Sequence, residues 1–122
     1  MAKQITSLTD IIKNEEILAK GCQYYREGEI NGRWRLFDPL EDMLLAYSMI
    51  HQDQEMVVIM NLNCNKEVAS RITVDRNLSP AGSKLKDVAG RHKMYIVEEE
   101  GGRNFVSVKL KPNTFAVLKA LR

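Results

Sequence analysis

The chain has 122 residues, of which 44% are hydrophobic and 28% charged, and its formal net charge is +2. This length is typical of one domain and is enough to bury roughly two thirds of the surface that the unfolded chain exposes. The composition is that of a soluble globular protein and excludes an intrinsically disordered chain. No apolar run approaches the roughly 18 residues needed to span a bilayer. The weak, dispersed charge indicates no nucleic-acid or membrane partner.

The first segment predicts an amphipathic helix over Ser7 to Lys20 that ends at Gly21. Ile17 lies off the main apolar stripe, which predicts that it contacts something else, such as a further domain. The next segment, Gln23 to Gly32, holds paired tyrosines and two glycines and is interpreted as a connection. The apolar stripe falls within one arc at about 100° per residue and consists of Ile5, Leu8, Ile11, Ile12, Leu18, Ala19 and Cys22.

The rest of the chain predicts β-strands, because short apolar runs alternate with polar residues and are bounded by turn residues. The run from Met56 to Leu62 is apolar on both faces, which predicts a strand in the middle of a covered sheet. Seven or eight strands are expected: an all-β fold, an antiparallel Greek-key β-sandwich with one N-terminal α-helix. The strands are predicted at Arg33 to Asp38, Met43 to Ile50, Met56 to Leu62, Val68 to Val74, Lys84 to Val88, Met94 to Glu98, Val106 to Leu110 and Thr114 to Lys119.

The core of this sandwich is predicted from the alternating apolar positions that should face inward. The residues expected to build it are Trp34, Leu45, Tyr47, Val58, Met60, Ile72, Val106, Val108, Leu110, Phe115 and Val117.

No residue pattern predicts a catalytic, cofactor-binding or metal-binding site. His51 and His92 are isolated in predicted turns, without ligands at zinc spacing, and are interpreted as solvated. The acidic residues Asp38, Glu41 and Asp42 do not match an EF-hand loop and are predicted to form a turn. No serine lies in a G-x-S-x-G elbow, and no glycines match a phosphate loop or a dinucleotide fingerprint. A small β-sandwich without an acid and base pair is more often a binding or structural module than an enzyme.

Cysteine content and the N-terminus leave the compartment open. Cys22 and Cys64 are interpreted as buried free thiols rather than a disulfide. The first residues, MAKQITSLTD, contain no apolar stretch of the kind found in a secretory signal.

Exposed aromatic residues are the candidates for sugar contact, because flat rings are what sugar rings stack upon. Trp34, Tyr24 and Tyr25 are these candidates. Trp34 alternates with Leu36, which also predicts packing into the core or against the helix. Tyr24 and Tyr25 place one ring on each side of an extended segment, so one of them is expected to be exposed.

Several stretches resemble the C-terminal domain of glycoside hydrolase family 13, the α-amylase family. In that domain a strand of the type "vlaYsR" leads through a polar turn to "vlVvlNfs", which is similar to DMLLAYSMIHQDQEMVVIMNLN (Asp42 to Asn63). LKDVAG (Leu85 to Gly90) resembles its "L.DLLSG" stretch, and VSVKLKPNTFAVLK (Val106 to Lys119) resembles its closing "v.LpPysa.VL" hairpin. The predicted helix would correspond to the last helix of the catalytic barrel. The C-terminal sandwiches of α-galactosidases and β-galactosidases have a similar organisation.

The resemblance implies a non-catalytic accessory domain of an α-amylase-like glycoside hydrolase, which supports the catalytic barrel in α-glucan metabolism and in some members contacts sugar. The family's catalytic residues belong to the barrel, so none is carried over, and the chain alone is not expected to be an enzyme. The helix and connection would occupy residues 1–31 and the sandwich residues 32–122. Two alternatives remain open: an independent carbohydrate-binding module, and a small interaction protein that forms a homodimer through Ile11, Ile12 and Leu18.

Overall fold

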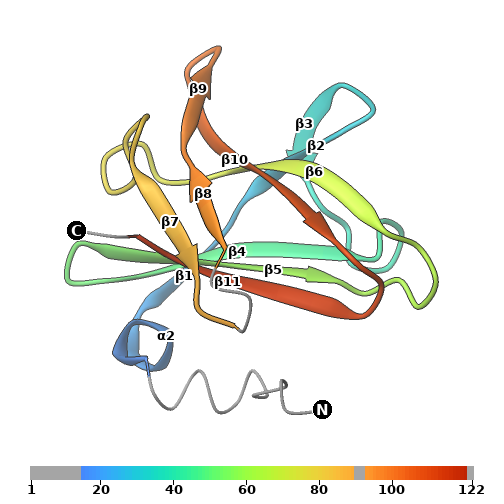
Figure 1. Ribbon diagram of the computed structural model, residues 1–122, viewed down its shortest axis with the longest axis horizontal. Helices are drawn as coiled ribbons and strands as arrows, with labels where there is room; N and C mark the ends of the chain where they lie inside the picture. The colour runs from blue at the N-terminus through green and yellow to red at the C-terminus, as the bar shows by residue number, and fades with distance from the viewer. Residues whose placement is uncertain (1–14, 90–92, 121–122) are drawn as a thin grey trace.

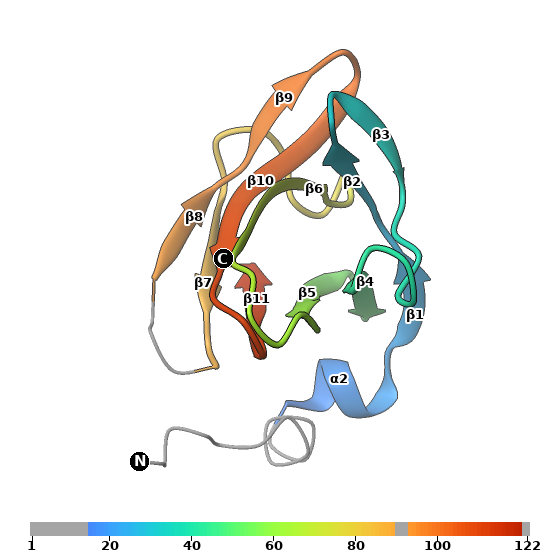
Figure 2. The ribbon, with the colours of Figure 1, turned by 90° about the vertical axis from the view of Figure 1, so that its right-hand side faces the viewer.

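The computed structural model describes residues 15–89 and 93–120, which form two antiparallel sheets packed face to face and one short helix (Figure 1). Sheet A has six strands, in the spatial order β1 (Cys22–Tyr25), β4 (Leu44–His51), β5 (Gln54–Asn61), β11 (Thr114–Ala120), β7 (Lys84–Asp87) and β8 (Met94–Ile96). Sheet B has five, in the order β3 (Arg33–Leu36), β2 (Glu27–Ile30), β6 (Val68–Thr73), β10 (Arg103–Leu110) and β9 (Glu98–Glu100). The helix is α2 (Glu16–Lys20), and Figure 2 shows it on the side of sheet A that faces away from sheet B.

The predicted all-β sandwich is confirmed, but the described residues contain eleven strands instead of seven or eight. The interpretation of Gln23 to Gly32 as a connection was wrong, because it contains β1 and β2. These strands join different sheets, and Arg26 alone separates them. The predicted boundary between residues 31 and 32 therefore falls inside the β2–β3 hairpin. Asn31 and Gly32 form its turn, both with positive φ, as the two-residue turns of twisted hairpins require.

The core lies between the sheets and draws small or branched side chains from sheet A. Ala46, Val57, Ile59, Ala116 and Leu118 are its members from β4, β5 and β11. Sheet B contributes the predicted residues Ile72, Val106, Val108 and Leu110, and these four predictions are confirmed.

The predicted inward direction was wrong for the other core candidates. Trp34 lies on the outer face of sheet B, where its ring contacts Phe105 and Arg71. In sheet A the register aligns Tyr47 with Val58 and Val58 with Val117, and all three point away from sheet B. Because side chains alternate along a strand, Leu45, Met60 and Phe115 share this outward side. Both sides of these strands are apolar, so alternation alone could not tell one from the other.

Helix α2 lies against the outward side of sheet A. Ile17 and Leu18 are buried there with Met56, Val58 and Val117, and the Glu15 carboxylate lies 3.0 Å from the Lys119 ammonium. Helix α2 confirms the C-terminal turn of the predicted helix, whereas residues 7–14 lie outside the described residues. The further contact predicted for Ile17 is with the chain's own sheet.

The helix ends at Gly21 as predicted, and the glycine is needed because of a close approach. The Gly21 N–H donates to the Ile17 carbonyl at 2.8 Å. A Cβ at this position would lie 2.5 Å from the Ile17 oxygen and 3.0 Å from the Ile50 oxygen.

A buried carboxylate joins the two sheets near the β1–β2 crossing. Glu55 on β5 is fully enclosed and accepts hydrogen bonds from Ser48 Oγ at 2.5 Å and Ser79 Oγ at 2.6 Å. Arg26 donates to the same carboxylate at 3.3 Å and to Ser48 Oγ at 2.7 Å. The Asp75 N–H also donates to Glu55, at 3.0 Å. These contacts give the buried side-chain oxygens of Glu55, Ser48 and Ser79 their hydrogen-bond partners, as burial requires.

A second buried polar residue, Asn61, holds the opposite end of the sandwich. Its amide Nδ2 donates to the carbonyl oxygens of Lys66 at 2.9 Å and of Leu110 and Lys111 at 3.1 Å. Its Oδ1 accepts from the backbone N–H of Asn63 at 3.0 Å. One side chain thus ties the end of β5 to the following loop and to the β10–β11 turn.

Candidate functional site

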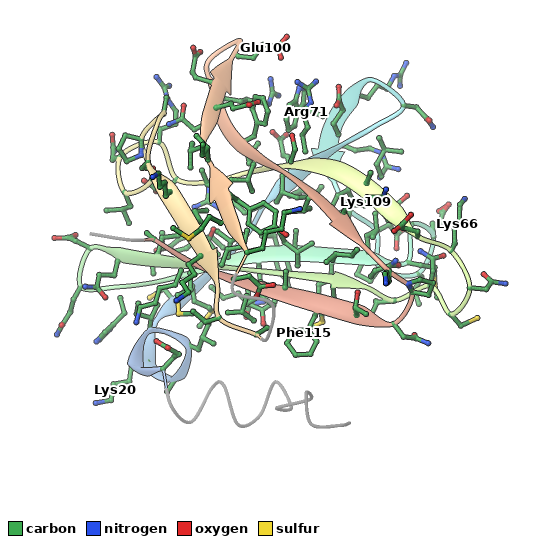
Figure 3. All side chains as sticks on the ribbon, in the orientation of Figure 1. Lys20, Lys66, Arg71, Glu100, Lys109 and Phe115 are labelled. Atoms are coloured by element: carbon green, nitrogen blue, oxygen red, sulfur yellow. The ribbon has the colours of Figure 1, made fainter. Side chains whose placement is uncertain are left out.

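The outer face of sheet A carries a second apolar cluster, outside the core. Three of its residues, Met56, Val58 and Val117, are fully buried beside α2. The apolar side chains packed around these three are only partly buried. These neighbours are Tyr47, Met49, Met60, Val88, Ala89 and Phe115. Figure 3 shows Phe115 projecting on the α2 side, away from Arg71 and Glu100 on the other layer. We call this surface, defined by the six partly buried residues, the apolar outer face.

The apolar outer face arises directly from the strand sequences. Strand β5 is apolar at successive positions from Met56 to Met60, so it offers an apolar side chain to each side of the sheet. The β4–β5 turn at Gln52 and Asp53 has positive φ at both residues and keeps the two strands in register. A sheet with two apolar faces is normally covered on both.

Tyrosines mark the edge of the apolar outer face. Tyr25 on β1 lies opposite Tyr47 on β4, with ring centroids 6.3 Å apart and planes at 72°, an edge-to-face contact. Burial, together with the neighbouring Tyr25, raises the pKa of the Tyr47 hydroxyl. The Tyr47 ring therefore stays neutral at physiological pH, and it adds apolar surface to the face.

The predicted sugar contacts do not form one platform. Tyr24 and Tyr25 are 48% and 61% exposed on opposite sides of β1, so both are exposed where only one was expected. Tyr25 also lines a pocket of about 250 Å³. Trp34 lies on β3 of the other sheet. Sugar contact by these three residues stays a prediction.

Trp34 is enclosed by arginines on the outer face of sheet B. The guanidinium carbons of Arg71 and Arg103 each lie 5.2 Å from the Trp34 ring, and Arg71 lies 4.9 Å from the Phe105 ring. The two rings are themselves 5.6 Å apart. Cation–π contacts of this kind hold β3, β6 and β10 together.

Carboxylates complete this cluster and link it to the remaining strands of sheet B. Arg71 Nε donates to Glu29 on β2 at 2.6 Å, and its Nη1 donates to Glu100 on β9 at 2.8 Å. Arg103 donates to Glu27 at 3.3 Å. The hydrogen bonds from Arg71 lower the pKa of Glu29. The cluster therefore touches all five strands of sheet B and serves their alignment.

The acidic turn has the structural role predicted for it. Asp38 Oδ1 accepts from the Leu40 N–H at 2.9 Å, and Asp42 accepts from the Asp38 N–H at 2.7 Å. Arg35 binds both oxygens of Asp42, at 2.7 and 2.8 Å, and this contact lowers the pKa of the carboxyl group.

The described residues contain no group of three side chains suited to hold a metal ion. Cys22 and Cys64 are free, as predicted, but they are exposed rather than buried. The interpretation of His51 as solvated was wrong for its Nε2, which is buried and has no hydrogen-bond partner among the described residues. His92 lies outside them. In the part of the chain that the structure describes, no helix has the length and apolar character needed to cross a membrane.

Sequence reasoning found the strands that build the apolar outer face but assigned its side chains to the core. The signal was present, because a strand apolar on both faces indicates two covered sides. What the sequence did not supply was the side on which sheet B lies.

No protein-family model matches the chain, and no curated protein matches it. Solved structures do resemble it. An α-amylase from Geobacillus thermoleovorans, complexed with acarbose, aligns over 93% of this chain with a TM-score of 0.64 and 12% identity. A substituted form of AmyP in complex with maltotriose aligns over 86% with a TM-score of 0.51 and 11% identity.

The alignments cover only part of those proteins, 21% of the α-amylase chain and 17% of the AmyP chain. This chain therefore spans about a fifth of the length of the structures it matches. At these identities the likeness is one of fold. The predicted resemblance to the α-amylase family is confirmed at that level: the chain has the fold of one β-sandwich portion of such a protein.

Proposed function

We propose that the chain is a non-catalytic accessory domain of an α-amylase-like glycoside hydrolase, and that it supports the catalytic barrel in α-glucan metabolism. The observation that carries the proposal is the apolar outer face, which α2 covers only in part. A contiguous apolar surface of this kind marks a protein interaction site. We infer that the barrel packs on it, around Phe115, Met60 and Tyr47.

The ionisable groups support a non-catalytic role. Glu55, the fully enclosed carboxylate, is held by Ser48, Ser79 and Arg26, so it serves the fold and cannot reach a substrate. Glycoside hydrolysis requires two carboxyl groups that flank the scissile bond. The described residues that line the pocket beside Tyr25 include no such pair, and the proposal assigns the chemistry to the barrel.

The first experiment identifies the polypeptide in which this chain occurs. Antibodies against the chain are used on extracts of the source cells, and the size of the reactive band is compared with the 14.0 kDa of the chain. We expect the reactive band to be a polypeptide of several hundred residues that co-purifies with α-glucan-hydrolysing activity. A monomer of 14 kDa that separates from all such activity would refute the proposal.

The second experiment tests the docking surface in that parent polypeptide. Phe115→Asp places a charge on the apolar outer face, while Ala69→Asp places the same charge on the exposed outer side of sheet B. We expect Phe115→Asp to lower the temperature at which α-glucan hydrolysis is lost, because the charge would be buried against the barrel. Equal effects of the two substitutions would contradict docking through this face.

A second candidate function, independent sugar binding, is favoured by the exposure of Tyr25. Affinity gel electrophoresis through starch tests it: retardation that is lost in Tyr25→Ala but kept in Leu40→Ala would support a sugar contact at Tyr25. Trp34→Ala tests the other predicted contact in the same gel. The absence of any retardation of the unsubstituted chain would reject this function.

Homodimerisation through the N-terminal helix has less support. Leu18 is buried against the chain's own sheet, and Ile11 and Ile12 lie outside the described residues. A concentration-independent monomeric mass by light scattering would exclude this alternative.

A further inference from the structure

The pocket beside Tyr25 lies between the ends of β1 and β3 and the start of β4. Its volume is about 250 Å³. Tyr25, Leu36, Phe37 and Pro39 form its walls, and Arg26 is the charged residue among the described ones that line it. The wall is open to solvent at Leu36, which is 55% exposed.

Packing holds the pocket open. The Phe37 ring rests on Gly28, where a Cβ would lie only 2.0 Å from the ring Cζ, so the ring takes the space that a side chain would need. Arg26 is drawn toward Ser48 and Glu55 by its hydrogen bonds. Tyr25 is supported by its edge-to-face contact with Tyr47. These fixed walls make the pocket a preformed one, of the kind that ligands favour.

Size and charge select the occupant. The volume exceeds the roughly 150 Å³ of a dry cavity that holds benzene and is below the roughly 300 Å³ at which pockets for drug-sized ligands begin. One ring therefore fits. Arg26 is already paired with Glu55, and Asp38 and Glu41 lie exposed on the adjacent loop. An anionic ligand would meet these acidic groups and a cationic ligand would meet Arg26 in the pocket wall, so a neutral ring is favoured.

The pocket is continuous with the apolar outer face, because Tyr25 lines one and contacts Tyr47 in the other. We propose that it receives an uncharged aromatic side chain from the same polypeptide that packs on the apolar outer face. This rests on the proposed function, since the partner is the barrel. An aromatic anchor in a preformed pocket at the edge of a larger surface is a common form of interface hot spot.

The first test uses indole, the ring of tryptophan, as the probe for the isolated 122-residue chain. We expect indole to shift the amide NMR signals of the pocket residues and to saturate at about millimolar concentration, as befits a fragment of this size. Leu36→Glu, at the wall, should weaken binding by about tenfold or more. Leu40→Glu, an equal charge change on the exposed loop, should not. The absence of shifts, shifts elsewhere, or equal effects of the two substitutions would overturn the proposal.

Maltotriose is titrated in parallel, because a sugar could use the same tyrosine. Shifts at the pocket with maltotriose and none with indole would overturn the aromatic occupant in favour of a sugar.

The final arm repeats the indole titration on the parent polypeptide. There we expect no shift at the pocket, because the partner's side chain already occupies it. Binding as strong as in the isolated chain would overturn the proposal while leaving the accessory role intact. If the parent proves not to be a glycoside hydrolase, the proposed function fails, whereas occlusion of the pocket can still be observed.

Discussion

Replacing Asn61 with aspartate should destabilise the fold far more than the nearly identical shape of the two side chains would indicate. Asn61 is 1% exposed, and its Nδ2 donates to three backbone carbonyls at 2.9 to 3.1 Å. An aspartate oxygen at this position has no proton to donate, so the carbonyls lose their partner. Each unsatisfied buried group costs about 1–3 kcal/mol, and we expect a total loss of about 4 kcal/mol at pH 8. That is a large part of the roughly 5–15 kcal/mol by which a domain is stable.

The pH dependence of Asn61→Asp provides a sharper test than its size. The carbonyls favour the protonated acid, so the substituted carboxyl has a higher pKa in the folded state than in the unfolded one. The stability that Asn61→Asp loses relative to the unsubstituted chain should therefore be smaller at pH 4 than at pH 8, since the stabilising proton is lost as the pH rises through the folded pKa. Urea unfolding, followed by the fluorescence of the single tryptophan, measures this. Asn113→Asp, on an exposed turn, is the control. A loss below about 1 kcal/mol at pH 8, equal to that of the control, would show that the amide does not tie the strands.

Three further predictions concern sheet B and the pocket wall. Because Arg71 lowers the pKa of Glu29, the ion pair stabilises the fold above the ordinary pKa of 4.5, and this contribution is lost as the pH falls through the lowered value. In Glu29→Gln, the free energy of unfolding measured with urea should therefore fall less steeply at acid pH. An unchanged dependence on pH would contradict the prediction. Arg71→Ala should shift the Trp34 emission to the red, because the ring loses the cover of the guanidinium group; an unshifted spectrum would refute the stacking. Gly28→Ala should cost about 1–3 kcal/mol by forcing the Phe37 ring outward, which calorimetry would detect as a lowered Tm; a neutral effect would mean that the ring does not rest there.

Strands β3 to β8, β10 and β11 were predictable because their apolar residues lie in runs bounded by turn residues. Strand β9 was not, because its three glutamates form no apolar run. Strands β1 and β2 were missed for a physical reason: β1 is exposed along its whole length and so carries no burial pattern. Strand β2 is short and places Gly28 at its centre, where the Phe37 ring replaces a side chain. One signal was available, since Asn31-Gly32 is a strong hairpin dipeptide.

The direction in which the side chains of each strand point was harder to predict than the position of the strand in the sequence. Tyr47, Val58 and Val117 are large and apolar, and a sequence reading puts such residues in the core. Their neighbours along the strands, Ala46, Val57 and Ala116, point into the core instead. The space between the two sheets also has to hold the side chains of sheet B. Which face is inner depends on where the second sheet packs, and that follows from distant pairings such as β6 with β10. The apolar outer face could therefore be predicted as an apolar surface but not as an outward one.

The contact between Arg26 and Glu55 has a consequence for strand alignment. Successive side chains along a strand point to opposite sides of the sheet. A shift of β1 by one position would therefore turn Arg26 away from Glu55 and leave the enclosed Glu55 carboxylate without its positive partner. An unpaired charge of this kind costs about 3–5 kcal/mol, enough to reject the shifted alignment. Apolar contacts could tolerate such a slip, because the neighbouring strands are apolar on both sides. The charged pair thus selects one strand alignment among several whose apolar contacts would be equally acceptable.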